Sequence, residues 1–246
     1  MRRSARCTQM KASSTDHNSE AQILSFVCHE LRSPVQKIVA TVDLLALMDL
    51  PPDAHKAIQR LDRSACELAR TLSSIARFHR ASAGMFAEQL ETVVLPELVL
   101  SAADEARDSY PDGPVIETIL DEQLAGKIEV DRDRLKHILS NYVLNAVRHG
   151  TGPLVRIVAR CNQSLLRIEV TNSGRFNGPR SDPLDWRPFE RGNVASGEER
   201  GMGLGLVVVK LLAGQVDWEI GLSDEAASDT TTFFVQLPFR PAAQQL

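Results

Sequence analysis

Two stretches in the first third of the chain place apolar residues at alternating steps of three and four. The first stretch has Leu24, Cys28, Leu31, Val35, Ile38, Val42 and Leu45, and the second has Ile58, Leu61, Ala65, Leu68, Leu72 and Ile75. This heptad pattern is typical of a helix that is buried along one narrow stripe. It predicts a helix over residues 19–48 and a second helix that ends at about residue 80. Two prolines, Pro51 and Pro52, end the first helix because they cannot continue it.

The two predicted helices must lie antiparallel, because the turn between them is short. A single hairpin leaves much of each apolar stripe in water, so we expect two copies to pair into a four-helix bundle, which makes the protein a homodimer. A hairpin that packs against the rest of its own chain is the alternative. Residues 1–18 are polar and without periodicity, and they predict a disordered arm before the hairpin domain of residues 19–82.

The pattern changes after Ser82-Ala83-Gly84, which we interpret as a hinge. Helices are predicted over residues 95–107, from 131 onward, and from the glycine-rich run at 201–206 to about 213. Strands are predicted at residues 115–120, 127–130, 154–160, 165–170, around 216–222, and around 231–237. This mixture predicts an α/β sandwich, a mixed sheet with helices on one face, over residues 83–240, and a tail over 241–246.

Composition narrows the classes of protein that the chain resembles. Its 246 residues are 24% charged and 43% hydrophobic with a net charge of −4, as in ordinary globular proteins, so a nucleic-acid partner is not expected. Residues 35–50, the most apolar run, fall short of the roughly 20 clean residues that span a bilayer. The first 20 residues lack the apolar core of a secretory signal. We therefore expect a cytoplasmic chain with no membrane anchor of its own, and its four scattered cysteines argue against a zinc site.

His29 is the first candidate for chemistry. It follows the stripe residue Cys28 by one position, so a helical turn of about 100° carries it off the apolar stripe. The neighbouring Glu30 could hold one ring nitrogen or take its proton while the other nitrogen attacks an electrophile. Pro34, about one turn later, should bend the helix and open the site. The plain alternative is a surface histidine beside a harmless kink.

Asn141 and Asn145 are the second candidates, because residues four apart share one face of the helix that begins at Asp131. Their amide oxygens suit a hard cation such as Mg²⁺, which usually keeps water and substrate phosphates as its other ligands. Arg148 could reach the same region with a fork that matches a phosphate. A solvated polar face is the plain alternative.

Gly201, Gly203 and Gly205 stand directly before a helix, where bare backbone N–H groups and the positive helix end can cradle a phosphate. The run departs from the dinucleotide-binding pattern, because Leu206 takes the third glycine position, and it lacks the Lys-Ser/Thr ending of a P-loop. Asn172, at the end of a predicted strand, could recognise the edge of a purine or simply cap a turn.

In this order, the motifs resemble those of the kinase core of two-component sensor histidine kinases, over about residues 19–239. His29 to Pro34 resembles the phosphoacceptor motif, Asn141 to His149 the asparagine box, Pro188 to Arg191 the phenylalanine box, Gly201 to Leu206 the second glycine box, and Thr231 to Pro238 the closing strand. The resemblance implies a dimerisation and phosphotransfer hairpin joined to a Bergerat-type ATP-binding domain. Its implied cofactors are ATP and Mg²⁺, and its implied partner is the receiver domain of a response regulator.

The resemblance also implies a role for each matching residue. Glu30 would act as base while His29 Nε2 attacks the γ-phosphate, and Ser33 could orient water for dephosphorylation of the receiver. Asn145 would hold Mg²⁺, and residues 173–200 would form a mobile lid anchored by Phe189. The implied nucleotide site comprises Asn141, Asn145, Arg148, His149, Asn172, Gly174, Phe189, Arg191, Gly201, Gly203, Leu204, Gly205 and Leu206.

Four positions depart from the family pattern: Asn172 stands for an aspartate, Phe176 and Asp229 for glycines, and Arg148 for a common lysine. The leading hypothesis is a kinase that autophosphorylates on His29. The alternative is a non-catalytic phosphotransfer or docking dimer whose ATP-like domain has degenerated. A Ser/Thr kinase on the same ATP fold would have little need of the hairpin. Sensory input would come from another protein, from the arm, or from a sensor region missing in this chain.

Overall fold

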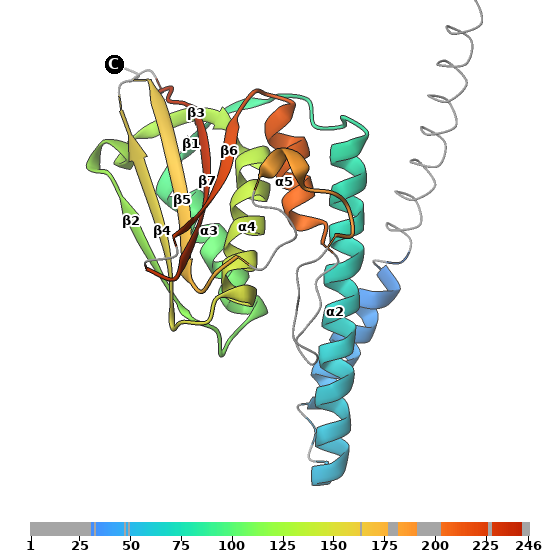
Figure 1. Cartoon of the computed structure of the whole chain (residues 1–246). Coiled ribbons are helices and arrows are strands. Elements are labelled where there is room, and N and C mark those ends of the chain that lie inside the picture. The colour runs from blue at the N-terminus through green and yellow to red at the C-terminus, as the bar shows by residue number, and fades with distance from the viewer. Residues whose placement is uncertain are drawn as a thin grey trace, which may run out of the picture. The chain divides into compact units, whose positions relative to one another are not determined.

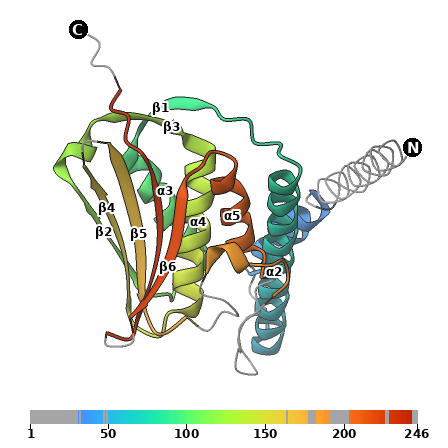
Figure 2. The ribbon, with the colours of Figure 1, turned by 45° about the horizontal axis from the view of Figure 1, so that its top comes forward.

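Figures 1 and 2 show the computed structural model, which describes residues 31, 33–46, 48, 50–162, 164–176, 182–190, 203–225 and 228–242. The chain forms two compact units, residues 1–85 and residues 86–246. Across the ranges just given, no helix combines the length and the apolar character that crossing a membrane requires.

The first unit contains the two predicted helices as far as its described residues extend. Residues 33–46 are helical, and α2 runs over Pro52–Ser82. Pro52 stands at the start of α2, where an N–H would have no partner within the helix. After α2 the chain turns at Gly84, whose φ of 64° suits glycine. The predicted start of the first helix, with His29 and Glu30, lies outside the described residues.

The heptad stripe of this unit is divided into two rows with different exposure. Each row repeats every seven residues. Val35, Val42, Ala65 and Leu72 are buried, whereas Leu31, Ile38, Leu61 and Leu68 are each 44–49% exposed. A single copy of the chain therefore leaves one row of large apolar side chains in contact with water.

The second unit is built on a five-stranded sheet of order β2-β4-β5-β7-β6. The strands are β2 Val115–Leu120, β4 Leu154–Cys161, β5 Leu165–Ser173, β6 Glu219–Glu225 and β7 Thr230–Pro238. β2 pairs with β4 in parallel and the other pairs are antiparallel, so the sheet is mixed. The helices α3 Leu95–Ser109, α4 Arg132–His149 and α5 Gly205–Gly214 lie on one face of it (Figures 1 and 2). The predicted α/β sandwich is confirmed.

The core lies between this sheet and its helices because alternate strand residues point toward the helices. Every second residue of β5 and β7 is buried, which is the period of a strand with one covered face. Tyr142 of α4 stacks on Phe233 of β7 at 5.3 Å between ring centroids and donates its hydroxyl to the Phe234 carbonyl at 3.0 Å. Burial raises the pKa of Tyr142 far above its usual value.

A second, two-stranded sheet pairs β1 Leu90–Val94 with β3 Lys127–Asp131. β1 was not predicted, and the predicted strands at 115–120 and 127–130 prove to belong to different sheets, separated by the 3₁₀ turn Glu122–Ala125. The chain returns to β3 near its end, where Glu129 N–H donates to the Arg240 carbonyl and Ala242 N–H to the Lys127 carbonyl, both at 2.8 Å. Residues 240–242 are thus held against the second unit.

Candidate functional site

The middle of the site is α4, whose start is fixed by an aspartate cap. Asp131 precedes the helix, and its carboxylate accepts from the Arg134 N–H at 3.0 Å, which satisfies one of the unpaired donors at the helix start. An apolar stripe then packs toward the sheet; its members are Leu135, Ile138, Leu139, Tyr142, Val143 and Ala146. Burial of that stripe leaves Asn141 and Asn145 half-buried on another face of the helix.

Asn141 connects α4 with the start of α5. Its Nδ2 donates to the His137 carbonyl one turn earlier at 2.7 Å, so the amide nitrogen is engaged within the helix. Its Oδ1 lies 3.0 Å from the point where a Cβ on Gly205 would be. The amide oxygen of Asn141 therefore stands against bare backbone at the first residue of α5.

Gly203 and Gly205, the described glycines of the run, are glycine for different reasons. Gly203 has a φ of 68°, and a Cβ there would lie 2.4 Å from the Glu190 carbonyl oxygen, so a side chain is excluded by conformation and by space. Leu204 is buried and anchors the run, whereas Leu206 is half-buried. Gly205 opens α5, where helix N–H groups and the positive helix end favour an anion. The bare backbone and the helix end together fit a phosphate-bearing ligand, and the neighbouring Asn141 oxygen, which is an acceptor, suits a cation bound with that ligand.

Asn172 lies at the end of β5, where three loops meet. It is buried, and its Nδ2 donates to the Ser173 carbonyl at 2.9 Å, so the amide presents its oxygen to any ligand. Gly174 has a φ of 98°; its N–H donates to the Asp229 carbonyl at 2.7 Å and its carbonyl accepts from Thr231 Oγ1 at 2.8 Å. Gly150, just after α4, is packed so closely that a Cβ would lie 3.2 Å from Asn172 Cβ. The end of α4 and the end of β5 are thus adjacent.

Arg148 and His149 end α4. Arg148 Nε donates to the Tyr110 hydroxyl at 3.0 Å, which ties the arginine to the end of α3, and His149 is exposed. Their roles toward a nucleotide stay predictions, as does the role of Asn145 toward Mg²⁺. Within the described ranges, no three or more His, Cys, Asp or Glu side chains gather into a group that could hold a metal ion.

Residues 182–190, which lie within the predicted lid, are hydrogen-bonded to α5. The sequence did not predict these hydrogen bonds. Lys210 Nζ donates to the carbonyls of Leu184 and Trp186, and Trp186 is buried. The available signal was a single lysine inside the otherwise apolar helix Gly205–Gly214. Phe189 has a φ of 64° and is 62% exposed. Arg191 and Gly201 lie outside the described residues.

In the first unit, Ser33 is helical and exposed, while His29 and Glu30 lie outside the described residues. The structure therefore brings together Asn141 with Gly205, and Asn172 with Gly174, but gives no geometry for the phosphoacceptor.

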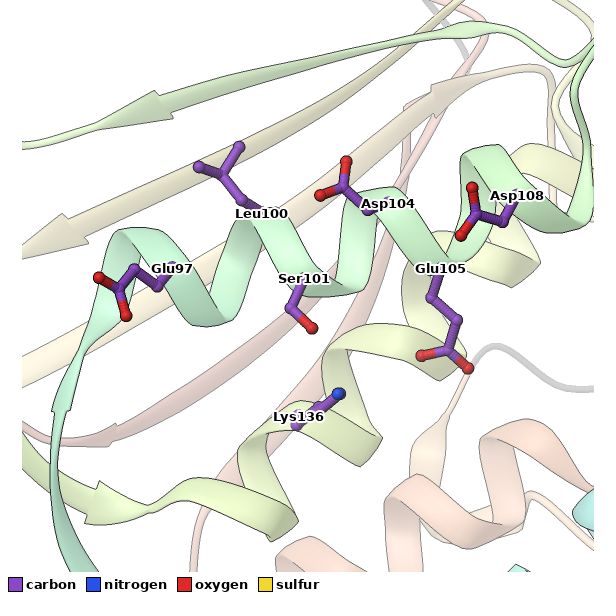
Figure 3. A pocket seen from close by; sticks show the side chains of 7 residues that line it. All are labelled: Glu97, Leu100, Ser101, Asp104, Glu105, Asp108 and Lys136. Carbon is purple, nitrogen blue, oxygen red and sulfur yellow. The ribbon is translucent and has the colours of Figure 1, made fainter.

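A groove of about 610 Å³ elsewhere on the second unit does not belong to this site. Figure 3 shows its lining along α3 and the facing part of α4, which comprises Glu97, Leu100, Ser101, Asp104, Glu105, Asp108 and Lys136. Four carboxylates stand against one ammonium group, so the groove would repel a triphosphate. None of the residues predicted to bind nucleotide lines it.

Comparison with known proteins finds similarity to an ATPase family and to sensor kinases. Residues 130–241 match the family described as histidine kinase-, DNA gyrase B-, and HSP90-like ATPase. The chain is 28% identical over 233 residues to the autoinducer 2 sensor kinase/phosphatase LuxQ of Vibrio parahaemolyticus, an alignment that covers 90% of this chain and 27% of LuxQ. It is 27% identical over 227 residues to the sensor histidine kinase TrcS of Mycobacterium tuberculosis, over 88% of this chain and 43% of TrcS. The chain thus spans less than half the length of either relative.

The crystal structure of full-length ShkA in complex with AMPPNP shares the fold. It aligns with a TM-score of 0.69 at 23% identity, over 92% of this chain and 47% of that chain.

Proposed function

Because the chain resembles the core of two-component sensor kinases over most of its length, we propose that it is an ATP-dependent protein-histidine kinase. The observation that carries this proposal is the position of the Asn141 amide oxygen, 3.0 Å from the place of a Cβ on Gly205 at the start of α5. Asn141 and the glycine run are 60 and more residues apart in sequence, and motif order alone predicts that they bind one nucleotide.

The nucleotide would lie along α4, between the start of α5 and the end of β5. The triphosphate of ATP would rest against Gly203 and Gly205, with Asn141 and Arg148 facing the phosphates. Asn145 would hold Mg²⁺, which neutralises phosphate charge when bound. Asn172, whose amide nitrogen is bonded to the Ser173 carbonyl, would offer its oxygen to the amino group of adenine.

In the proposed reaction, His29 Nε2 attacks the γ-phosphorus in line. The bond from that phosphorus to the β–γ bridging oxygen breaks, ADP leaves, and Glu30 takes the imidazole proton. The phosphohistidine then gives its phosphoryl group to a carboxylate oxygen of an aspartate on a response-regulator receiver domain. Ser33, which is exposed on its helix, would orient water if the same protein also dephosphorylates the receiver.

We also propose that the working unit is a homodimer in the cytoplasm. The exposed row of the heptad stripe supports this, because Leu31, Ile38, Leu61 and Leu68 would be covered by the same row of a second hairpin. Input would come from a separate sensory protein or a sensor region outside this sequence.

Incubation with radiolabelled ATP and Mg²⁺ tests the kinase. We expect acid-labile label on the protein that disappears in His29→Gln. The matched control is His55→Gln, a half-buried histidine of α2 that has no role in the proposal and should leave labelling unchanged. Label that survives His29→Gln would refute the assignment of His29.

A second candidate function is a phosphotransfer or docking dimer that no longer binds nucleotide. Two observations favour it: Asn172 replaces the charged residue of the family pattern, and Phe176 fills a glycine position with a ring that packs edge-on against Phe233 at 5.9 Å. Titration with a fluorescent ATP analogue separates the two functions. Saturable binding supports the kinase, whereas no binding at millimolar concentration supports the second function.

A further inference from the structure

Arg134 of α4 is a buried cation that joins three segments of the second unit. It has no exposed surface, and each nitrogen of its guanidinium group has a partner. Nε donates to Asp131 Oδ2 at 3.0 Å, and Nη2 donates to the Phe86 carbonyl at 2.8 Å. Nη1 donates to the Leu212 carbonyl at 2.6 Å and to Gln215 Oε1 at 3.1 Å.

Two of these segments matter for the proposed kinase. Leu212 is in the last turn of α5, the helix whose first residue is Gly205. Phe86 opens the linker, defined here as residues 86–89, through which the chain enters the second unit after the hairpin. Neither segment was connected to Arg134 by any sequence motif.

The linker is held at three points by one side of α4. Besides the bond from Arg134 to the Phe86 carbonyl, the Phe86 ring packs edge-on against the His137 ring at 5.6 Å between centroids. The Gln89 N–H donates to Asp131 Oδ2 at 3.4 Å, and the same carboxylate oxygen accepts from Arg134 Nε. The position of the linker therefore depends on the arrangement around Arg134.

α4 and α5 run antiparallel. They meet once where Asn141 faces Gly205 and again where Arg134 bonds the Leu212 carbonyl, beside the linker. Asn141 is seven residues after Arg134, and Leu212 is seven residues after Gly205, so both contacts are two turns apart on each helix. α5 has 10 residues, a rigid rod of about 15 Å. Because a helix this short moves as one body, a shift of its first turn would also shift the Leu212 carbonyl.

Because the guanidinium group of Arg134 is buried, its hydrogen bonds can change only together and not one at a time. A charged group that is shielded from water must keep all its hydrogen-bond partners, because the loss of one bond leaves a buried donor unsatisfied. When α5 moves the Leu212 carbonyl, the cluster of Arg134, Asp131, Gln215 and the linker must rearrange together.

We propose that Arg134 is a positioning residue that couples nucleotide at the start of α5 to the placement of the linker, and so to the hairpin that precedes the linker in the chain. This inference rests on the proposed function. Arg134 does not touch the nucleotide; it acts through α5 and through the Phe86 carbonyl.

Hydrogen exchange of the full-length chain, with and without a non-hydrolysable ATP analogue and Mg²⁺, tests the coupling. In the wild type, nucleotide should slow exchange of the Gln89 amide by about tenfold, the size of a typical coupling between sites. Arg134→Lys keeps the charge but loses the planar fork, so it cannot reach all four partners. In this variant the response of the Gln89 amide should disappear and autophosphorylation should fall by about tenfold, while nucleotide affinity stays within about threefold.

Two further variants separate coupling from simple structural support. Gln215→Ala removes only one exposed partner and should weaken the response without loss of folding. Arg132→Lys, an exposed neighbour paired with Asp133, is the matched control and should change nothing. An intact Gln89 response in Arg134→Lys, or a loss of nucleotide affinity in parallel with the response, would overturn the coupling. Nucleotide binding to the wild type without any Gln89 response overturns only the coupling, whereas no nucleotide binding overturns the proposed function as well.

Discussion

Asn141 and Gly205 are in contact across two helices: the amide oxygen of Asn141 lies 3.0 Å from the point where a side chain on Gly205 would begin. This contact fixes the start of α5 beside the asparagine face of α4. The proposed phosphate position depends on that backbone staying bare.

Gly205→Ala should therefore weaken nucleotide binding. The added methyl group would meet the Asn141 amide and occupy space next to the helix N–H groups, at a cost of about 1–2 kcal/mol, or roughly tenfold in affinity. Titration with a fluorescent ATP analogue measures the effect. The control is Gly214→Ala at the other end of the same helix, where an added Cβ would meet no atom within 4 Å. Equal affinity in both variants would contradict the proposed phosphate position.

Asn172→Asp should change nucleotide binding and stability in opposite directions. A carboxylate accepts a stronger hydrogen bond from the amino group of adenine, so affinity should rise by about fivefold. The same change removes the Nδ2 donor of the Ser173 carbonyl and buries a charge, which should lower the free energy of unfolding by about 1–2 kcal/mol.

Nucleotide affinity and urea denaturation, measured on one preparation, check both the expected rise in affinity and the expected loss of stability. Asn162→Asp in the β4–β5 turn is the control for the added charge, because its side-chain oxygen already acts only as an acceptor for Ser164 and Leu165 N–H groups. A loss of affinity in Asn172→Asp would argue against adenine at this position.

The elements of the second unit could largely be predicted because their signals are local. β2 follows from apolar alternation and lies at the predicted residues, and α4 follows from the Asp131 cap and begins within one residue of its predicted start. Spacing alone predicts that Asn141 and Asn145 share one face of α4. It also predicts that the glycine run lies at the start of α5. The helices of the hairpin could be predicted equally well, since a heptad stripe is a strong periodic signal.

The remaining features depend on contacts between distant residues. β1 has five residues, of which only Val93 is buried, so its alternation is too short to distinguish from a loop. The role of Arg134 has no sequence signal, because two of its partners are backbone carbonyls that lie 48 and 78 residues away. Lys210 likewise bonds carbonyls of a loop 24 and 26 residues earlier.

Gly221→Ala should destabilise the second unit. A Cβ at Gly221 would lie 2.0 Å from Phe234 Cε1, and the other side of that ring is covered by Arg167, whose guanidinium carbon is 3.7 Å from the ring centroid. The ring cannot move freely, so we expect a loss of about 1–3 kcal/mol in the free energy of unfolding. Both tryptophans of the chain, Trp186 and Trp218, lie in this unit, so their fluorescence reports its unfolding alone.

A second substitution tests the cause of that loss. Replacing Phe234 by Leu together with Gly221→Ala should recover most of the stability, because the clash is with the ring. Gly126→Ala, where a Cβ would meet nothing within 4 Å, should unfold like the wild type. A double variant no more stable than Gly221→Ala would show that the clash is not the reason.

Leu61→Glu combined with Leu68→Glu should convert the proposed dimer into a monomer. Both leucines belong to the exposed row of the α2 stripe, so in a four-helix bundle each charge would be buried against a partner hairpin. Sedimentation at micromolar concentration should give a dimer for the wild type and a monomer for the variant. Leu44→Glu is the control, because Leu44 is 66% exposed but lies off the stripe, where a charge stays in water. A wild-type monomer at that concentration, or a dimer that survives both glutamates, would mean that this row is covered by something other than a second copy of the chain.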